Sequence, residues 1–246
     1  MVFRRILVRA AVCIAALIML QGCVITLGPK IKTNQDELDA RARKLKTILV
    51  LTPDVTVNEL AVGDVKEERP EWSEAGIDNV IAATKKRLAE KGKTAKIIDP
   101  KTSYRSEVDE IMELKLAVMD SVYRHAVVNP NNNMQTFPPR IEHFDYTVGD
   151  SSALLKAYHA DGMLMIRGQD NISTSGRKAL GVLRAINPLD DGQRKGVTFL
   201  EFVLADKNGD ILWWAWKANA GGFDLRDPAD TLAFVDDAIS NFPGKD

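Results

Sequence analysis

The chain has 246 residues, and its 33 lysines and arginines nearly balance 34 aspartates and glutamates, which gives a net charge of −1. Nucleic-acid-binding domains typically carry a basic excess, so this balance argues against a nucleic-acid partner. The chain is long enough for one well-buried domain, and no repeat of fixed period is visible in it.

The first element in chain order has the pattern of a signal peptide. Arg4, Arg5 and Arg9 form a positive region, and the unbroken apolar run Ala10–Leu20 follows it. Such a run makes roughly 16 Å of helix, whereas a membrane-spanning helix needs about 20 residues. The segment therefore predicts a cleaved signal rather than a permanent anchor.

The residues at the end of this run indicate the type of signal. Leu20-Gln21-Gly22-Cys23 resembles the bacterial lipobox, which implies a diacylglyceryl group on the Cys23 thiol, cleavage after Gly22 and acylation of the new amine, commonly by palmitate. Val24 replaces the aspartate that retains enterobacterial lipoproteins in the inner membrane, so the resemblance implies the outer membrane. Two alternatives remain open, an ordinary signal peptide with an incidental Cys23 and a twin-arginine signal at Arg4-Arg5.

Cleavage at this site sets the predicted organisation. Residues 1–22 are the signal peptide, residues 23–45 the lipidated N-terminus and tether, and residues 46–246 a single domain. Three arginines and no acidic residue leave with the signal, so 30 basic residues remain against 34 acidic ones and the net charge becomes about −4. Cys13 leaves as well, so the domain has no disulfide to form in an oxidising periplasm.

Hydrophobic patterning then predicts a parallel βαβ start. Thr47–Leu51 is typical of a buried strand, and Val55–Val62 is a further extended piece. The next helix takes Ser73 as its N-cap and Gly92 as its C′ residue. A second short strand follows at residues 94–98. Two strands joined by a helix within about 50 residues are expected to be parallel.

The second half predicts a long helix, a long loop and a hairpin. The expected elements are a helix at 106–128, a loop at 129–149, a short helix at 151–160, a strand at 162–170, a helix at 174–187, a hairpin turning at Asn208-Gly209, and a last helix capped by Asp227. The predicted fold class is α/β, a mixed sheet with a parallel βαβ start, a C-terminal antiparallel hairpin and covering helices.

Motifs for catalysis or metal binding are weak. His125, His143 and His159 lack the spacing of metal ligands. The stretch 206–210 begins like a calcium loop, but its glycine comes two residues early and the twelfth position is a lysine. Residues 173–177 could bind an anion at a helix start, although N-capping alone explains them. We therefore expect no catalytic residue, no metal site and no cofactor.

Two features are candidate partner surfaces. The first is the tip of the long loop, made of Asn131, Asn132, Asn133, Met134, Gln135, Thr136 and Phe137. The second is a strand with Trp214 and Trp216 on one face and Trp213 on the other. Tryptophans in a half-buried strand usually belong to the core, whereas an exposed tryptophan would mark a partner or ligand surface.

The order of elements, with "FDYTVGD", "GRKAL" and "ADKNGDILWW", resembles a family of proteobacterial outer-membrane lipoproteins. The wider architecture is similar to the TolB N-terminal domain and to the periplasmic domain of the curli secretion lipoprotein. The resemblance covers most of the mature chain. It implies an α/β scaffold or assembly module of the cell envelope and supplies no catalytic residue.

The expected function is that of a non-enzymatic lipoprotein, anchored to the outer membrane through Cys23, facing the periplasm and binding a cell-envelope protein. One alternative is a periplasmic small molecule or glycan bound through the tryptophan-bearing strands and the 129–149 loop. Another is a hydrolase without a recognised motif, which a buried carboxylate pair near His143 would favour. The sequence indicates no oligomeric state.

Overall fold

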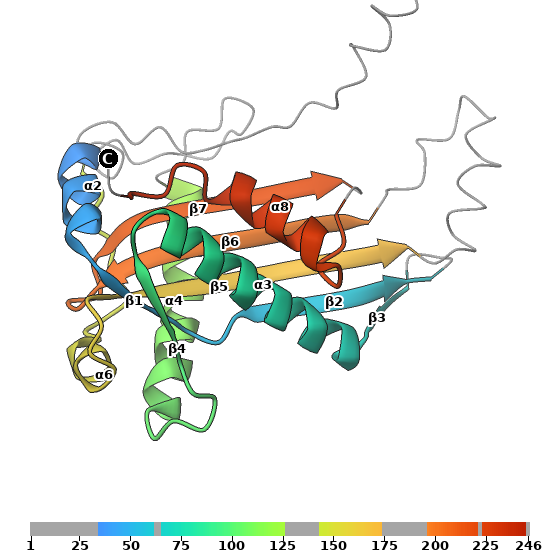
Figure 1. Ribbon diagram of the computed structural model, residues 1–246, viewed down its shortest axis with the longest axis horizontal. Coiled ribbons are helices and arrows are strands. Elements are labelled where there is room, and N and C mark those ends of the chain that lie inside the picture. Colours follow the sequence, from blue (N-terminus) through green and yellow to red (C-terminus); the bar gives the residue numbers. More distant parts are fainter. Residues whose placement is uncertain (1–33, 62–64, 126–142, 174–195, 221–222, 245–246) are drawn as a thin grey trace, which may run out of the picture.

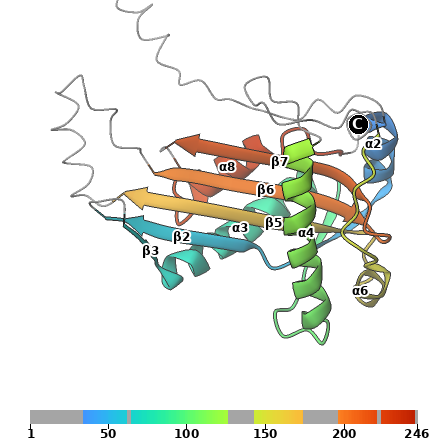
Figure 2. The ribbon, with the colours of Figure 1, turned by 180° about the vertical axis from the view of Figure 1, so that it is seen from behind.

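The computed structural model describes residues 34–61, 65–125, 143–173, 196–220 and 223–244. They form a seven-stranded mixed sheet with helices on both faces (Figures 1 and 2), which confirms the predicted α/β class. The helices are α2 (Gln35–Lys44), α3 (Pro70–Glu90), α4 (Arg105–His125), α6 (Ser152–Ala157) and α8 (Pro228–Ala238). The strands are β1 (Thr47–Val50), β2 (Asp54–Leu60), β3 (Lys66–Glu68), β4 (Thr94–Ile97), β5 (Gly162–Ser173), β6 (Val197–Asp206) and β7 (Ile211–Ala220).

The long strand β5 organises the sheet. One of its edges pairs with β6, and β7 lies beyond β6, both antiparallel to their neighbours. The other edge pairs in parallel first with β1, at Gly162–Leu164, and then with β2, at Arg167–Ser173. β1 and β2 therefore follow one another along a single edge, separated by residues 51–53. β4 pairs in parallel with β1, which confirms the predicted βαβ unit.

The two faces of the sheet carry different helices. Figure 1 shows α3 and α8 on one face, and Figure 2 shows α4 crossing the strands on the other. Side chains alternate between these faces along each strand. On β2, for example, Val57 points to α3, because a Cβ built on Gly76 of α3 would lie 3.1 Å from a Val57 methyl. Asp54, three residues before, points to the α4 face and lines a pocket there.

Helix α3 begins four residues earlier than the capping pattern predicts, with Arg69 in place of Ser73 as the N-cap. Pro70 occupies the first turn, where its missing N–H costs nothing. Ser73 is buried inside the helix, and its hydroxyl accepts a hydrogen bond from the Val57 amide at 2.9 Å. Ser73 thus ties α3 to β2 instead of capping the helix. Gly92 has φ +73° directly after α3, as predicted for a C′ glycine.

The folded domain begins before residue 46, the boundary predicted from sequence. Helix α2 buries Leu38 and Ala42 against the domain. Its Arg41 guanidinium lies 2.6 Å from both Asp206 and Asp210 at the β6–β7 turn. Residues 34–45 therefore belong to the domain. The same contacts explain the two aspartates that resemble a calcium loop, because an arginine already lies between their carboxylates.

The Asn208-Gly209 dipeptide predicts a type I′ turn with Gly209 at positive φ, but the β6–β7 turn is of another type. Gly209 has φ +80°, as expected, but among the described residues His159 is the only non-glycine with positive φ, so Asn208 is not left-handed. The Gly209 amide donates to the Asp206 carbonyl at 2.9 Å. These features define a type I turn followed by a left-handed glycine, a longer hairpin loop than the two-residue type I′ turn.

Two of the three motifs that carry the resemblance, "FDYTVGD" and "NGDILWW", pack against each other. The Val148 amide donates to the Gly209 carbonyl at 2.9 Å, and the Ile211 amide donates to the Tyr146 carbonyl at 2.9 Å. Phe144 is buried, and its ring centroid lies 5.0 Å from that of Tyr146. "FDYTVGD" is thus the segment that covers the "NGDILWW" turn, so both motifs serve the fold.

Candidate functional site

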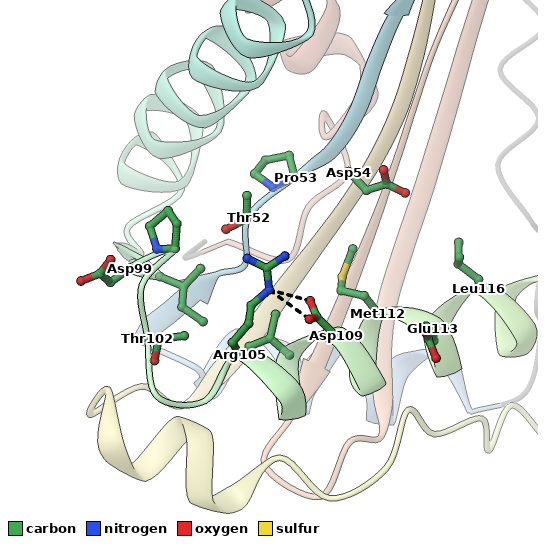
Figure 3. Close-up of a pocket in the computed structure, with 13 residues that line it drawn as sticks. Thr52, Pro53, Asp54, Asp99, Thr102, Arg105, Asp109, Met112, Glu113 and Leu116 are labelled. Carbon is green, nitrogen blue, oxygen red and sulfur yellow. Dashed lines mark hydrogen bonds and ion pairs between the residues drawn. The ribbon is translucent and has the colours of Figure 1, made fainter. Parts of the chain in front are cut away.

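A groove of about 480 Å³ opens where the first parallel strands end (Figure 3). Three segments form it: the break between β1 and β2, the β4–α4 connection, and the first half of α4. The lining residues are Thr52, Pro53, Asp54, Ile98, Asp99, Pro100, Thr102, Arg105, Val108, Asp109, Met112, Glu113 and Leu116. Ligands of open α/β sheets bind at this carboxyl edge of the strands, so the groove is the candidate functional site.

Local sequence explains why a groove forms here. After β1 the Leu51 amide still pairs with the Leu164 carbonyl at 3.0 Å, but Pro53 has no amide to continue the ladder. On the other side, the Asp99 carboxylate accepts from the Lys101 amide at 2.8 Å and starts a turn. The chain then reaches α4, where the Val108 amide pairs with the Tyr104 carbonyl at 3.0 Å. The segments that follow β1 and β4 diverge and leave a gap, which α4 closes on one side only.

The groove has an apolar floor. Ile98 and Val108 are buried beneath it, and Met112 is partly buried. Leu116 remains 36 % exposed at the groove, and Leu114 on the same helix is 41 % exposed outside it. Large apolar side chains exposed beside a concave surface are typical of binding sites for other molecules.

Carboxylates dominate the groove's charge. Asp54, Asp99, Asp109 and Glu113 line it, against Arg105 as the one cation in the lining. Arg105 is engaged by Asp109, with its Nε at 2.9 and 3.0 Å from the two carboxylate oxygens. Glu113 forms no ion pair with any other described residue. Figure 3 shows Asp54 on the strand side and Glu113 on the helix side, with Met112 between them.

A buried polar cluster holds α4 on the sheet next to the groove. Lys115 is fully buried and pairs with Glu201 of β6, which is 3 % exposed. The Tyr123 hydroxyl donates to the second Glu201 oxygen at 2.8 Å. Burial lowers the pKa of Lys115, an effect that the Glu201 charge opposes, and burial together with that charge raises the pKa of Tyr123. The cluster fixes the position of α4, because an unpaired buried charge would be costly.

Sequence reasoning missed this cluster, although a signal for it is present. The apolar stripe of α4 includes Ile111 and Met119, and Lys115 lies four residues from each. Positions at this spacing share one helix face, so Lys115 had to point into the sheet. Glu201 is likewise a carboxylate in the middle of an apolar strand.

The three tryptophans belong mainly to the core. Trp213 is 5 % and Trp214 is 6 % exposed, while Trp216 is partly buried. The predicted facing is found: Trp213 packs on Phe242, with ring centroids 4.8 Å apart, whereas Trp214 and Trp216 contact Tyr123. Trp213 and Trp214 therefore offer almost no surface to a partner, in contrast to their place in the predicted partner surface, because helices cover both faces of β7.

The other predicted site residues lie elsewhere. Cys23, Gly22 and the loop tip Asn131–Phe137 are outside the described residues. His143 and His159 are both exposed, and His159 has φ +47° just after α6. Across the described ranges, no group of three or more histidines, cysteines or carboxylates is placed to hold a metal ion. Within those ranges, no helix is both long and apolar enough to cross a bilayer.

Comparisons with known proteins add similar folds but no family. No family model matches the chain, and no curated protein matches it. Similar solved structures include the PelC dodecamer from Paraburkholderia phytofirmans, with TM-score 0.37, 12 % identity, and 82 % of this chain and 89 % of that chain covered. They also include the LpoB C-terminal domain from Salmonella enterica, with TM-score 0.25, 12 % identity, and coverages of 76 % and 96 %. At such scores and identities, neither similarity says what this chain binds.

Proposed function

We propose that this chain is a non-enzymatic lipoprotein, anchored to the outer membrane through Cys23 and facing the periplasm, which binds a cell-envelope protein in the groove beside α4. The observation that carries the binding role is the groove itself, with its apolar floor and the exposed Leu116. The anchoring role is supported by the sequence Leu20-Gln21-Gly22-Cys23 at the end of the apolar run.

The distance from the anchor to the domain supports a role close to the membrane. Ten residues separate Cys23 from Asn34, the first described residue. A chain of that length spans at most about 36 Å. A lipid on Cys23 would therefore keep the start of α2 near the bilayer surface, and two or more acyl chains would make the attachment stable.

The position of the groove suits a partner that approaches from the periplasm. In Figures 1 and 2, α2 lies at the top of the domain, whereas the β4–α4 connection and the start of α4 lie at the bottom. The groove, which is lined by that connection and the first half of α4, therefore lies toward the end of the domain away from α2. A domain held at α2 would present this end to the periplasm.

A small molecule is the second candidate ligand, because a volume of about 480 Å³ is in the range of small-molecule pockets. The glycan alternative loses part of its support, since sugar-stacking tryptophans would need exposed rings, and Trp213 and Trp214 are buried while Trp216 is partly buried. A protein partner remains the better proposal. The groove is open along one side, and its apolar surface continues onto the exposed Leu116.

Site-specific photocrosslinking in intact cells tests this function. A photoreactive amino acid replaces Leu116 in the full-length protein, and a matched variant carries it at Leu114, on the same helix but outside the groove. Material is purified through a C-terminal tag. We expect a discrete protein adduct from position 116 and a much weaker one from position 114. A folded, membrane-attached protein that gives no protein adduct from position 116 would contradict the proposal.

A further inference from the structure

We propose that the groove binds a basic segment of its partner, in which an apolar side chain enters the floor while a neighbouring lysine or arginine meets Asp54 and Glu113. This inference rests on the proposed function, since it names the chemistry of the protein segment bound there. It follows from the combination of shape and charge in one place.

The apolar part of the segment is required by the floor. Ile98, Val108 and Met112 come from two elements and converge under the opening. Leu116 extends this surface along α4, although an isolated exposed leucine would not by itself indicate a partner. A single aliphatic or aromatic side chain inserted here would cover these residues, in the way that buried anchors act at protein interfaces.

The basic part of the segment is required by the carboxylates. Four of the lining side chains are acidic and one is basic, and that one, Arg105, is already paired with Asp109. Arg167 stands beside the groove, 3.9 Å from Asp54, so Asp54 is partly compensated. Among the described residues, no lysine or arginine forms an ion pair with Glu113. A partner cation near Glu113 would complete the local charge balance, whereas an acidic segment would be repelled.

The surface of α4 continues the same sign of charge. Glu110 is exposed one turn before Glu113, and Glu107 is partly exposed one turn earlier. Both residues lie on α4 outside the groove lining, so their charges would attract a basic chain toward the groove before contact. On the opposite face of the sheet, α3 also carries exposed acidic residues, such as Glu74, which does not line the groove. Glu74 therefore offers a control of equal charge.

The test uses the Leu116 photocrosslink with three further substitutions in the full-length anchored protein: Glu113→Gln, Glu113→Lys and Glu74→Lys. We expect the adduct yield to fall several-fold with Glu113→Gln, the effect of losing an exposed ion pair, and further with Glu113→Lys, which adds repulsion. Glu74→Lys should leave the yield unchanged. Mass spectrometry of the adduct should place lysine or arginine within a few residues of the crosslinked position in the partner.

The outcomes separate the two proposals. An adduct whose yield is the same in Glu113→Lys as in the parent, or a bound segment without a basic residue, would overturn the charge inference and leave the groove as a protein-binding site. Loss of the adduct in Glu74→Lys to the same extent would also overturn it, since the effect would then be one of net charge alone. Absence of any adduct in the parent would remove both proposals.

Discussion

Gly209 lies in direct backbone contact with Gly149: a Cβ built on Gly209 would be 1.8 Å from the Gly149 carbonyl oxygen. Both glycines have positive φ, +80° and +85°. The β6–β7 turn and the "TVGD" segment can approach this closely only because Gly209 carries no side chain. The contact explains why these two sequence-distant motifs occur together.

The first prediction follows from this contact. Gly209→Ala should lower the free energy of unfolding by at least about 1–3 kcal/mol, because the left-handed backbone is strained for alanine and the new methyl displaces the Gly149 backbone. Chemical denaturation measures the change. Asn208→Ala, at the exposed neighbouring position, is the control and should stay within about 0.5 kcal/mol. Equal midpoints for the Gly209 variant and the parent would be incompatible with the packed turn.

The second prediction concerns the buried cluster under α4. Lys115→Met leaves the Glu201 carboxylate buried without its cation, so it should cost about 3–5 kcal/mol of unfolding free energy. Adding Glu201→Gln removes the orphaned charge and keeps an acceptor for the Tyr123 hydroxyl. The double variant should therefore recover most of the loss.

Thermal or urea unfolding of Lys115→Met, Glu201→Gln and the double variant decides between coupling and independence. If the double variant is as unstable as the sum of its single changes, Lys115 and Glu201 do not form a coupled pair, and the account of how α4 is held on the sheet is wrong.

The third prediction is a pH dependence at Asp170. This carboxylate is 1 % exposed and accepts from the Thr198 hydroxyl at 2.9 Å and the Leu225 amide at 3.0 Å. Burial raises its pKa above the ordinary 3.8, although both hydrogen bonds oppose the shift. The folded protein therefore holds this proton at pH values where the unfolded chain has lost it. The resulting stabilisation is complete below the ordinary pKa and is lost as pH rises through the raised one.

Comparison with Asp170→Asn isolates that contribution. The unfolding free energy of the parent minus that of the variant should become smaller as pH rises from about 4 toward 7. Urea denaturation at several pH values gives the difference. A difference that grows with pH would mean that the Asp170 pKa is lowered, not raised, in the folded state.

The fourth prediction concerns the anchor. Cys23→Ser removes the thiol that we propose receives the lipid, so the precursor should stay uncut and held in the membrane by its apolar segment. Labelling with palmitate and the mass of the mature protein report this directly. Normal processing of the serine variant and its release into the periplasm would contradict the proposed lipoprotein class.

Much of the fold could be predicted because its signals are local. Asp227 accepts hydrogen bonds from the Ala229 and Asp230 amides, as its position before Pro228 predicts, and Gly92 closes α3. Helix α2 was missed because it is polar almost throughout and buries only Leu38 and Ala42. Its place depends on Arg41 meeting two aspartates about 165 residues away, a pairing that no local pattern contains.

The candidate site was less predictable than the fold. The groove exists because β1 and β2 follow one another along β5 while β4 ends beside β1, and this arrangement joins segments 50 residues apart. The tryptophans instead predicted a partner surface on β7, but Trp213 packs against Phe242 of the same chain. Apolar side chains alone do not reveal whether another element of the same chain will cover them.

The most direct test of the central claim, that the groove beside α4 binds a protein partner, is recovery of that partner with two matched variants. Leu116→Arg places a bulky cation at the groove, and Leu114→Arg places the same side chain on the same helix outside it; both positions are already exposed. The protein identified by the photocrosslink at position 116 should no longer co-purify with the Leu116→Arg variant, whereas it should still co-purify with Leu114→Arg. The comparison holds when the two variants have equal melting temperatures and equal membrane attachment. Full recovery with the folded Leu116→Arg variant would contradict the account.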